Sequence, residues 1–271
     1  MELSKSVLHS AILAVSNVAQ TQRAHGIDIS KYDKFFQPET ATGQLDFVVQ
    51  RIGYGLFRDE AFETLVGGVM QVPIRGGYHY LTSGVSWKAQ ADLFLQHVEG
   101  RRYHFFACDF EGYYNEMSPQ FAHDAWQWIE YVAKNSGVKT ILYTNPSNYD
   151  GYISPSVKQY GIDWDDVDLW LAQYWYVPDP NKNPSMPKGR TDWRIWQYTS
   201  KGNGTQYGVS RPTACDLNVF NGTVAEMRSW LGLDSTPPPP DPPANKKMVI
   251  EFAGHGTIEI ARDAVLNIKE K

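Results

Sequence analysis

The sequence predicts an α/β protein built on a TIM-like β/α barrel, with helices missing between the last strands and a small C-terminal β-hairpin segment. Two observations predict the barrel. Eight short apolar segments recur within residues 25–233, and several are apolar at consecutive positions, as in strands covered on both faces. Helical patterns separate the earlier segments and weaken between the last three. Strands and helices that alternate in this number suit a closed barrel.

Each element can be placed on the sequence. The expected strands are Gly26–Ile29, Phe47–Ile52, Ile74–Tyr80, His104–Phe110, Thr140–Thr144, Leu169–Tyr174, Arg194–Tyr198 and Cys215–Val219. The expected helices are Glu60–Val69, Trp87–Val98, Pro119–Asn135 and Val224–Leu231. The third helix has the clearest limits, because Ser118 is a cap residue, Pro119 suits the first helical position, and Gly137 follows the end.

Both ends of the chain differ from the barrel region, residues 25–233. Residues 1–24 form an N-terminal extension in which Lys5 precedes a mildly apolar run, and this run fits a poor signal peptide or a short amphipathic helix. Residues 234–245 are a proline-rich linker, which we expect to be an extended spacer. Residues 246–271 are a small β-rich segment, in which two short strands flank Gly254-His255-Gly256.

Composition argues against several kinds of protein. The formal net charge is −5, whereas nucleic-acid and anionic-membrane partners need concentrated positive charge. The sequence holds no run of about 18 apolar residues, so no membrane span is predicted. Two cysteines cannot make a disulfide framework, and we expect Cys108 and Cys215 to be buried free thiols. Aromatic residues make up 14% of the chain, which suits a sugar-binding cleft as well as an ordinary core.

An acidic pair, Asp109 and Glu111, ends one of the apolar strands. Residues i and i+2 lie on the same face of a strand, so we expect their carboxyl groups about 5–7 Å apart. Retaining glycosidases need a similar separation, and the pKa of one carboxyl rises because two like charges resist joint ionisation. A carboxyl kept protonated can donate its proton to a leaving oxygen. Taken alone, the pair also fits a solvated strand end.

Other polar and aromatic residues lie at the ends of separate predicted strands: Asp28, Asp216, Tyr78, Tyr80, Tyr143 and Gln197. The carboxyl ends of the strands of a parallel barrel meet at one mouth. We therefore expect these side chains to converge with the acidic pair. Because the repulsion among four carboxylates costs stability, such a gathering indicates a functional site.

Five segments resemble, in order and spacing, the glycoside hydrolase family 25 muramidases. They are His25-Gly-Ile-Asp-Ile-Ser30, Asp109-Phe-Glu111, Leu142-Tyr-Thr-Asn145, Trp196-Gln-Tyr-Thr-Ser200 and Asp216-Leu-Asn-Val-Phe220. The resemblance covers about residues 25–232. It implies an eight-stranded β/α barrel that hydrolyses the β-1,4 bond between N-acetylmuramic acid and N-acetylglucosamine in bacterial peptidoglycan.

The resemblance also implies roles for single residues. Glu111 matches the general acid/base and Asp109 the second catalytic carboxylate, which either attacks the sugar or orients the N-acetyl group of the substrate. Asp28 and Asp216 match supporting acids on the floor of the site. The sugar subsites are expected to include Tyr78, Tyr143, Gln197 and Tyr80.

No zinc-type spacing of histidines and cysteines occurs, and the expected chemistry needs neither a metal nor a cofactor. One alternative is a different N-acetylhexosamine glycosidase, although the longer acidic run of chitinase-like barrels is missing. Another is a non-catalytic cell-wall-binding or structural phage protein.

We expect the protein outside the cell or in the cell wall, secreted or released at phage lysis. Because an isolated hairpin is marginal in water, residues 246–271 should dock on the barrel, on a second copy by self-association, or on the wall.

Overall fold

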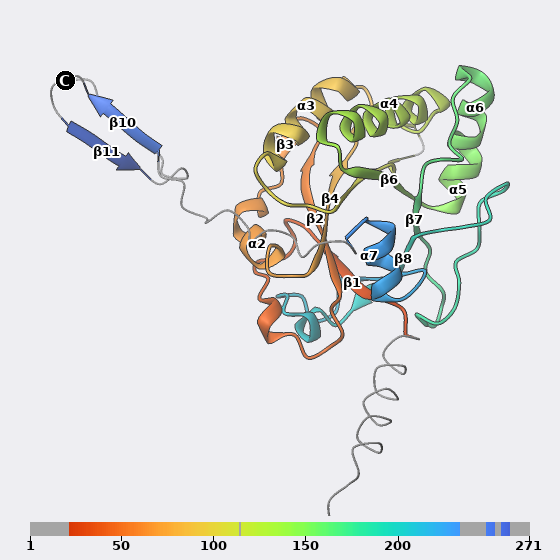
Figure 1. The fold of residues 1–271 in the computed structure, drawn as a ribbon. Coiled ribbons are helices and arrows are strands. Elements are labelled where there is room, and N and C mark those ends of the chain that lie inside the picture. Colours follow the sequence, from red (N-terminus) through yellow and green to blue (C-terminus); the bar gives the residue numbers. More distant parts are fainter. Residues whose placement is uncertain (1–21, 114, 234–247, 253–255, 261–271) are drawn as a thin grey trace, which may run out of the picture. The chain divides into compact units, whose positions relative to one another are not determined.

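The computed structural model describes residues 22–113, 115–233, 248–252 and 256–260, and its contacts divide the chain into units 1–235 and 236–271. The first unit is a closed barrel of eight strands (Figure 1). In chain order these are β1 (His25–Ile29), β2 (Phe47–Tyr54), β4 (Ile74–Tyr80), β5 (Phe105–Asp109), β6 (Lys139–Thr144), β7 (Leu169–Ala172), β8 (Ile195–Gly202) and β9 (Cys215–Phe220). Each strand pairs with the next, β9 pairs with β1, and a short β3 (Phe57–Arg58) extends β2. The predicted barrel is confirmed.

One strand departs from the expected parallel arrangement. β9 runs antiparallel to both of its neighbours, β8 and β1, while the other barrel pairings are parallel. A short connection is enough to join antiparallel neighbours, whereas a parallel crossover needs a dozen or more residues. Residues 203–214 join β8 to β9 and contain η3 (Gly204–Tyr207) but no longer helix to cross over the sheet, which fits an antiparallel return. The start of β9, with Asp216, therefore lies at the same end of the barrel as the carboxyl ends of the parallel strands.

The predicted helices are present with small changes in their limits, as α2 (Phe62–Val69), α3 (Trp87–Val98), α4 (Pro119–Ser136) and α7 (Val224–Trp230). The start of α4 is capped as predicted, since the Ser118 hydroxyl accepts a hydrogen bond from the Phe121 amide at 3.1 Å. Gly137 ends α4 with φ of 68°, a left-handed conformation that favours glycine.

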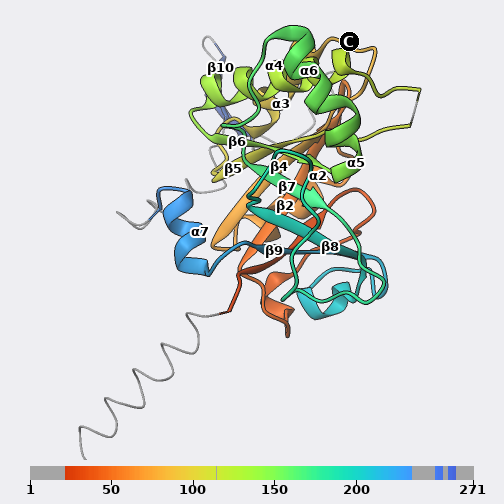
Figure 2. The ribbon, with the colours of Figure 1, turned by 90° about the vertical axis from the view of Figure 1, so that its right-hand side faces the viewer.

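The helices cover the barrel unevenly. The two longest, α3 and α4, pack together over β2, β5 and β6, whereas residues 173–194 join β7 to β8 without a helix (Figures 1 and 2). The expected loss of helices between the last strands is therefore confirmed. Short helical turns not predicted from the sequence, α5 (Pro146–Asn148), η2 (Tyr149–Ile153) and α6 (Ser154–Tyr160), join β6 to β7, and η1 (Pro38–Thr40) follows β1. The first three follow one another without a gap over residues 146–160, but the π-helical turn η2 interrupts the 3.6-residue period, and η1 is too brief to show one.

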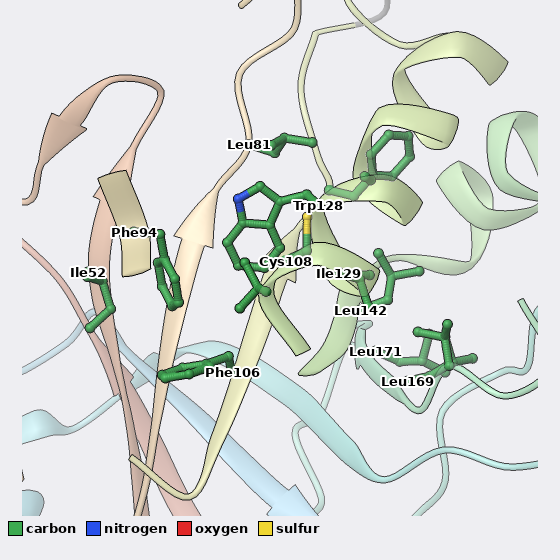
Figure 3. Packing of buried hydrophobic residues seen from close by; sticks show 14 of the residues in the cluster. Ile52, Leu81, Phe94, Phe106, Cys108, Trp128, Ile129, Leu142, Leu169 and Leu171 are labelled. Atoms are coloured by element: carbon green, nitrogen blue, oxygen red, sulfur yellow. The ribbon is translucent and has the colours of Figure 1, made fainter. Parts of the chain in front are cut away.

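A large apolar core fills the space between the barrel and its helices (Figure 3). Phe94 from α3 and Trp128 from α4 pack edge to face with ring centroids 5.0 Å apart, and Phe94 contacts Phe106 of β5 at 4.9 Å. His79 belongs to this layer, because its ring stacks on Trp128 at 5.6 Å. Both cysteines are free and buried, as expected from the sequence, and Cys108 lies in the same layer.

A second, smaller core fills the barrel itself, where alternate residues of the strands point inward. Phe105 and Ala107 of β5 lie there, so Asp109 continues the inward face toward the mouth. At the opposite end α7 closes the barrel, since the ring of Trp230 lies 5.8 Å from that of Phe105. Its first turn is fixed by a capping box, in which Thr223 and Glu226 each accept a bond from the other's backbone amide.

The second unit contains one hairpin, in which β10 (Met248–Phe252) pairs antiparallel with β11 (Gly256–Ile260). The hairpin predicted from the sequence is therefore present. The predicted linker 234–245 and all but residues 22–24 of the predicted N-terminal extension lie outside the described residues. None of the helices within the described ranges combines the length and apolar character that crossing a bilayer requires.

Candidate active site

An open pocket of about 280 Å³ lies at the mouth of the barrel. Seven of the eight residues predicted for the site line it: Asp28, Asp109, Glu111, Asp216, Tyr78, Tyr143 and Gln197. Ser30, Tyr32, Trp170, Tyr174 and Arg211 complete the lining. The structure thus brings together four carboxyl groups that come from the start, the middle and the end of the barrel sequence.

Strand alternation explains why these side chains point into the barrel. Asp28 follows Gly26 on the inward face of β1, and Gln197 follows Ile195 on that of β8. Asp216 starts the inward face of β9 and lies directly opposite Asp28 in the antiparallel register. Side chains opposite each other on antiparallel strands have Cβ atoms about 4.5–5.5 Å apart, so these two carboxyl groups repel each other strongly when both are ionised.

Asp28 is buried and is held by two side-chain amides. Gln197 Nε2 and Asn218 Nδ2 each donate a hydrogen bond to its Oδ2 atom at 2.8 Å. Burial raises the pKa of Asp28 to about 6, although both amide bonds favour the ionised form and oppose that rise. Two donors on one carboxylate oxygen suit an acid that is ionised at neutral pH.

The surrounding aromatic side chains fix the orientation of these amides. The Tyr143 and Tyr174 hydroxyls donate to Gln197 Oε1 at 2.9 and 2.5 Å, and the Trp170 indole donates to Asn218 Oδ1 at 2.8 Å. Each amide oxygen is therefore an acceptor, which leaves each nitrogen to donate to Asp28. These aromatic side chains are in this way connected to Asp28 at the floor of the pocket.

Asp109 and Glu111 form the second acidic group. Asp109 is 5% exposed, and its Oδ1 atom has no hydrogen-bond partner among the described residues. Burial, followed by the charges of Glu111 and Asp28, raises the pKa of Asp109 well above its usual value, while Arg51 opposes the rise. Burial and the charge of Asp28 also raise the pKa of Glu111. Buried acids with a charged carboxylate nearby hold a proton more tightly than isolated carboxyl groups do.

Asp216 is another carboxyl group of the pocket whose pKa is raised. Burial raises its pKa to about 8, Asp28 adds to the rise, and Arg211 opposes it. Arg211 comes from the loop between η3 and β9, and nothing in the sequence pattern of that loop marks it. Asn218 was also missed, although its place two residues after Asp216 on one strand could have indicated it.

Tyr80 is the sequence-predicted residue that does not line the pocket. It ends β4 beside the acids, because it pairs in register with Asp109. Burial raises the pKa of Tyr80 to about 12, and the charges of Asp109 and Glu111 contribute. Its expected contact with sugar stays a prediction.

Within the described ranges, no group of three or more histidine, cysteine, aspartate or glutamate side chains is arranged to hold a metal ion. The structure thus offers no candidate metal centre in those ranges, and the expectation that the chemistry needs no cofactor stays a prediction.

Comparisons with known proteins agree with this arrangement. Residues 27–206 match the sequence profile of Glycosyl hydrolases family 25. A family 25 glycosyl hydrolase from Bacillus anthracis aligns with a TM-score of 0.64 and 22% identity, over 78% of this chain and 96% of that one. The catalytic domain of an endolysin from a Listeria monocytogenes bacteriophage aligns with a TM-score of 0.60 and 23% identity, over 79% and 98%. These two likenesses show the shared fold.

A curated relative, the uncharacterized protein YegX of Escherichia coli, is 29% identical over 224 residues, which are 79% of this chain and 75% of that protein.

Proposed function

Because the chain belongs to family 25 of the glycosyl hydrolases, we propose that it hydrolyses the β-1,4 bond between N-acetylmuramic acid and N-acetylglucosamine in bacterial peptidoglycan. The observation that carries this proposal is the convergence of four carboxyl groups with raised pKa values at one open pocket. Such a site can hold a proton on one acid and a negative charge on another at the same pH, as acid-catalysed cleavage of a glycoside requires.

Glu111 is the general acid in this mechanism. Burial and the charge of Asp28 raise its pKa, which favours the protonated form, and its partial exposure lets it reach a bound substrate. As the bond between the anomeric carbon and the bridging oxygen breaks, the bond electrons pass to that oxygen and Glu111 gives it a proton. The resulting carboxylate then takes a proton from the water that completes hydrolysis.

Asp109 stabilises the positive charge that develops at the anomeric carbon, either by attacking it or by orienting the N-acetyl group that does so. This role requires the ionised form of Asp109. Without substrate, burial and the charges of Glu111 and Asp28 raise the pKa of Asp109 well above its usual value, and Arg51 opposes the rise. The positive charge that develops at the anomeric carbon acts in the same direction as Arg51, because an opposite charge nearby favours the ionised carboxylate. Asp109 lines the pocket, which places its carboxyl group beside a bound substrate.

The aromatic wall supports a sugar substrate. Three of its rings are nearly buried: Tyr78, Tyr143 and Trp170. The Trp170 ring packs edge to face against the other two, with centroid distances of 6.1 Å to Tyr78 and 4.7 Å to Tyr143. Tyr174 is half exposed and presents its ring at the rim of the pocket. Rigid aromatic faces of this kind contact the apolar faces of sugar rings at a small cost in side-chain entropy.

The variants Glu111→Gln and Asp109→Asn test the mechanism. Each keeps the shape of the side chain and removes its ability to transfer a proton or carry charge, so each should lower kcat by about 10²–10⁴-fold without unfolding the protein. Glu130→Gln, an exposed change on α4, is the matched control and should keep wild-type activity. Full turnover by Glu111→Gln would remove this residue from the reaction.

The identity of the cleaved bond needs a product analysis. Purified peptidoglycan and chitin are digested side by side, the products are reduced with borohydride, and mass spectrometry identifies the new terminal sugar. Reduced N-acetylmuramic acid is the expected result. Reduced N-acetylglucosamine from peptidoglycan, or rapid cleavage of chitin, would favour a different N-acetylhexosamine glycosidase, and binding without products would favour a wall-binding protein.

A substrate in the cell wall requires action outside the cell or within the wall, and we propose secretion or release at phage lysis as the route. The C-terminal segment stays a separate prediction. Sedimentation and pelleting with cell walls should be compared for the full chain and for a chain lacking residues 236–271. Fewer chains per particle for the shorter chain would support self-association, and weaker pelleting would support wall binding.

A further inference from the structure

Among the side chains that line the pocket, Arg211 carries the positive charge. Its side chain is 28% exposed, and its ion pair with Asp33 is long, at 3.9 Å between Nη1 and Oδ2. None of its N–H donors makes a hydrogen bond to another described residue. A guanidinium group offers a planar fork of donors, so Arg211 leaves most of that fork open toward the pocket.

The position of Arg211 is supported by the ring of Tyr32. The guanidinium carbon lies 5.9 Å from the ring centroid, within the range of a cation–π contact, and Tyr32 itself is 63% exposed and lines the pocket. Two further cations approach the same ring, Lys31 at 5.8 Å and Arg51 at 5.6 Å.

Those two cations already have partners. Lys31 Nζ contacts Glu60 at 3.1 Å, and Arg51 Nε contacts Asp59 at 2.5 Å. Arg51 Nη2 has no hydrogen-bond partner but is buried, and neither Lys31 nor Arg51 lines the pocket. Of the three cations around Tyr32, Arg211 is therefore the one that a ligand in the pocket can reach.

The rest of the pocket presents the opposite charge. Four carboxyl groups line it, and each ionised one repels an anionic substrate. The proposed substrate is anionic, because muramic acid carries a lactyl group whose carboxyl is free or extends into a stem peptide with its own carboxylates. Chitin carries no such group. A cation at the rim can offset the repulsion at the point where a pendant carboxylate would lie.

We propose that Arg211, supported by Tyr32, binds a carboxylate borne by the muramic acid unit of the substrate and so makes the enzyme prefer muramic-acid polymers to neutral ones. This inference rests on the proposed function. Guanidinium and carboxylate form paired, charge-assisted hydrogen bonds, and these bonds are stronger than those between neutral groups. The carboxylate is that of the lactyl group or of the stem peptide, and both share the chemistry that Arg211 recognises.

Four substrates separate these sources and isolate the charge. Glycan strands freed of stem peptides by an amidase carry lactyl carboxylates alone, and intact strands carry those of the stem peptides. Half of each preparation is amidated with a carbodiimide and ammonia, which replaces each carboxylate by a neutral group of similar size. The measured quantity is the ratio of kcat/KM for the charged and the amidated form of each strand.

The wild-type enzyme should favour the charged form by about tenfold to a hundredfold for at least one kind of strand. Arg211→Met should bring that ratio close to one, and Arg211→Lys should restore part of it. Lys34→Met is the matched control, because it removes one exposed positive charge beside the same loop, where the Lys34 amide donates to Ser210 Oγ at 2.8 Å. Its ratio should equal that of the wild type.

The ratio distinguishes recognition from a general effect on the catalytic acids. Arg211 also lowers the pKa values of Asp28 and Asp216, so Arg211→Met could change the rate on every substrate, but such a change cancels in the ratio. An unchanged ratio in both Arg211 variants would overturn the inference and leave the proposed function intact. If the wild type releases no product from any strand, the proposed function is overturned and this inference with it.

Discussion

Asp216→Asn should stabilise the protein, and more so as the pH rises. The pKa of Asp216 is raised from 3.8 to about 8, chiefly by burial and then by Asp28. The unfolded chain therefore loses this proton near pH 4, whereas the folded protein keeps it until about pH 8. Between these two pH values the folded state binds one more proton than the unfolded state. The free energy of unfolding therefore falls as the pH rises from about 4 to about 8.

The size of the effect follows from the pKa difference. A difference of about four corresponds to about 5–6 kcal/mol at 1.36 kcal/mol per pKa unit, and this is the upper limit for the cost of ionising Asp216 in the fold. Asp216 is partly exposed to screening by water, and an asparagine amide also loses solvent when buried. We therefore expect a gain of about 2–3 kcal/mol near pH 9 and almost none near pH 4. For a domain of this size the gain corresponds to a Tm higher by about 5–10 °C.

Thermal unfolding followed by circular dichroism at both pH values measures this gain. Asp166→Asn is the matched control, because it removes an exposed carboxylate outside the pocket and should leave the pH dependence of the wild type unchanged. An equal rise in Tm at both pH values, or a fall near pH 9, would show that the ionisation of Asp216 does not lower the stability of the barrel.

Three further changes test the floor, the interior and the closing helix of the barrel. Asn218→Leu removes one of the two amide donors to Asp28 and should raise the pKa of that carboxyl above about 6, as followed by carbon NMR titration; an unchanged titration would contradict the assigned role of the amide. Gly76→Ala places a Cβ 2.4 Å from the ring of Phe105 and should cost about 1–3 kcal/mol in the free energy of unfolding, measured with urea; a cost near zero would mean that the interior can shift freely. Thr223→Ala removes the hydroxyl of the capping box and should cost about 1 kcal/mol in the same assay, whereas Thr223→Ser should cost little.

The local features of the barrel could be predicted from the sequence. A strand repeats every two residues and a helix about every 3.6, so the apolar pattern showed the limits of α3 and α4 to within a residue. The same alternation placed Asp109 and Glu111 together at the end of β5. The helical stretch of α5, η2 and α6 escaped prediction, because the π-helical turn η2 in its middle interrupts the 3.6-residue period.

The sequence by itself determined which side chains each strand turns inward, because that choice depends on the geometry of a few consecutive residues. Only the tertiary structure decided which inward residues meet. Gln197 and Asn218 lie 169 and 190 residues from Asp28, and they reach it because the barrel closes between β9 and β1. The antiparallel course of β9 brings Asp216 to the mouth, and a loop without any pattern places Arg211 beside it. Contacts over such separations depend on how the whole sheet closes, which no local period records.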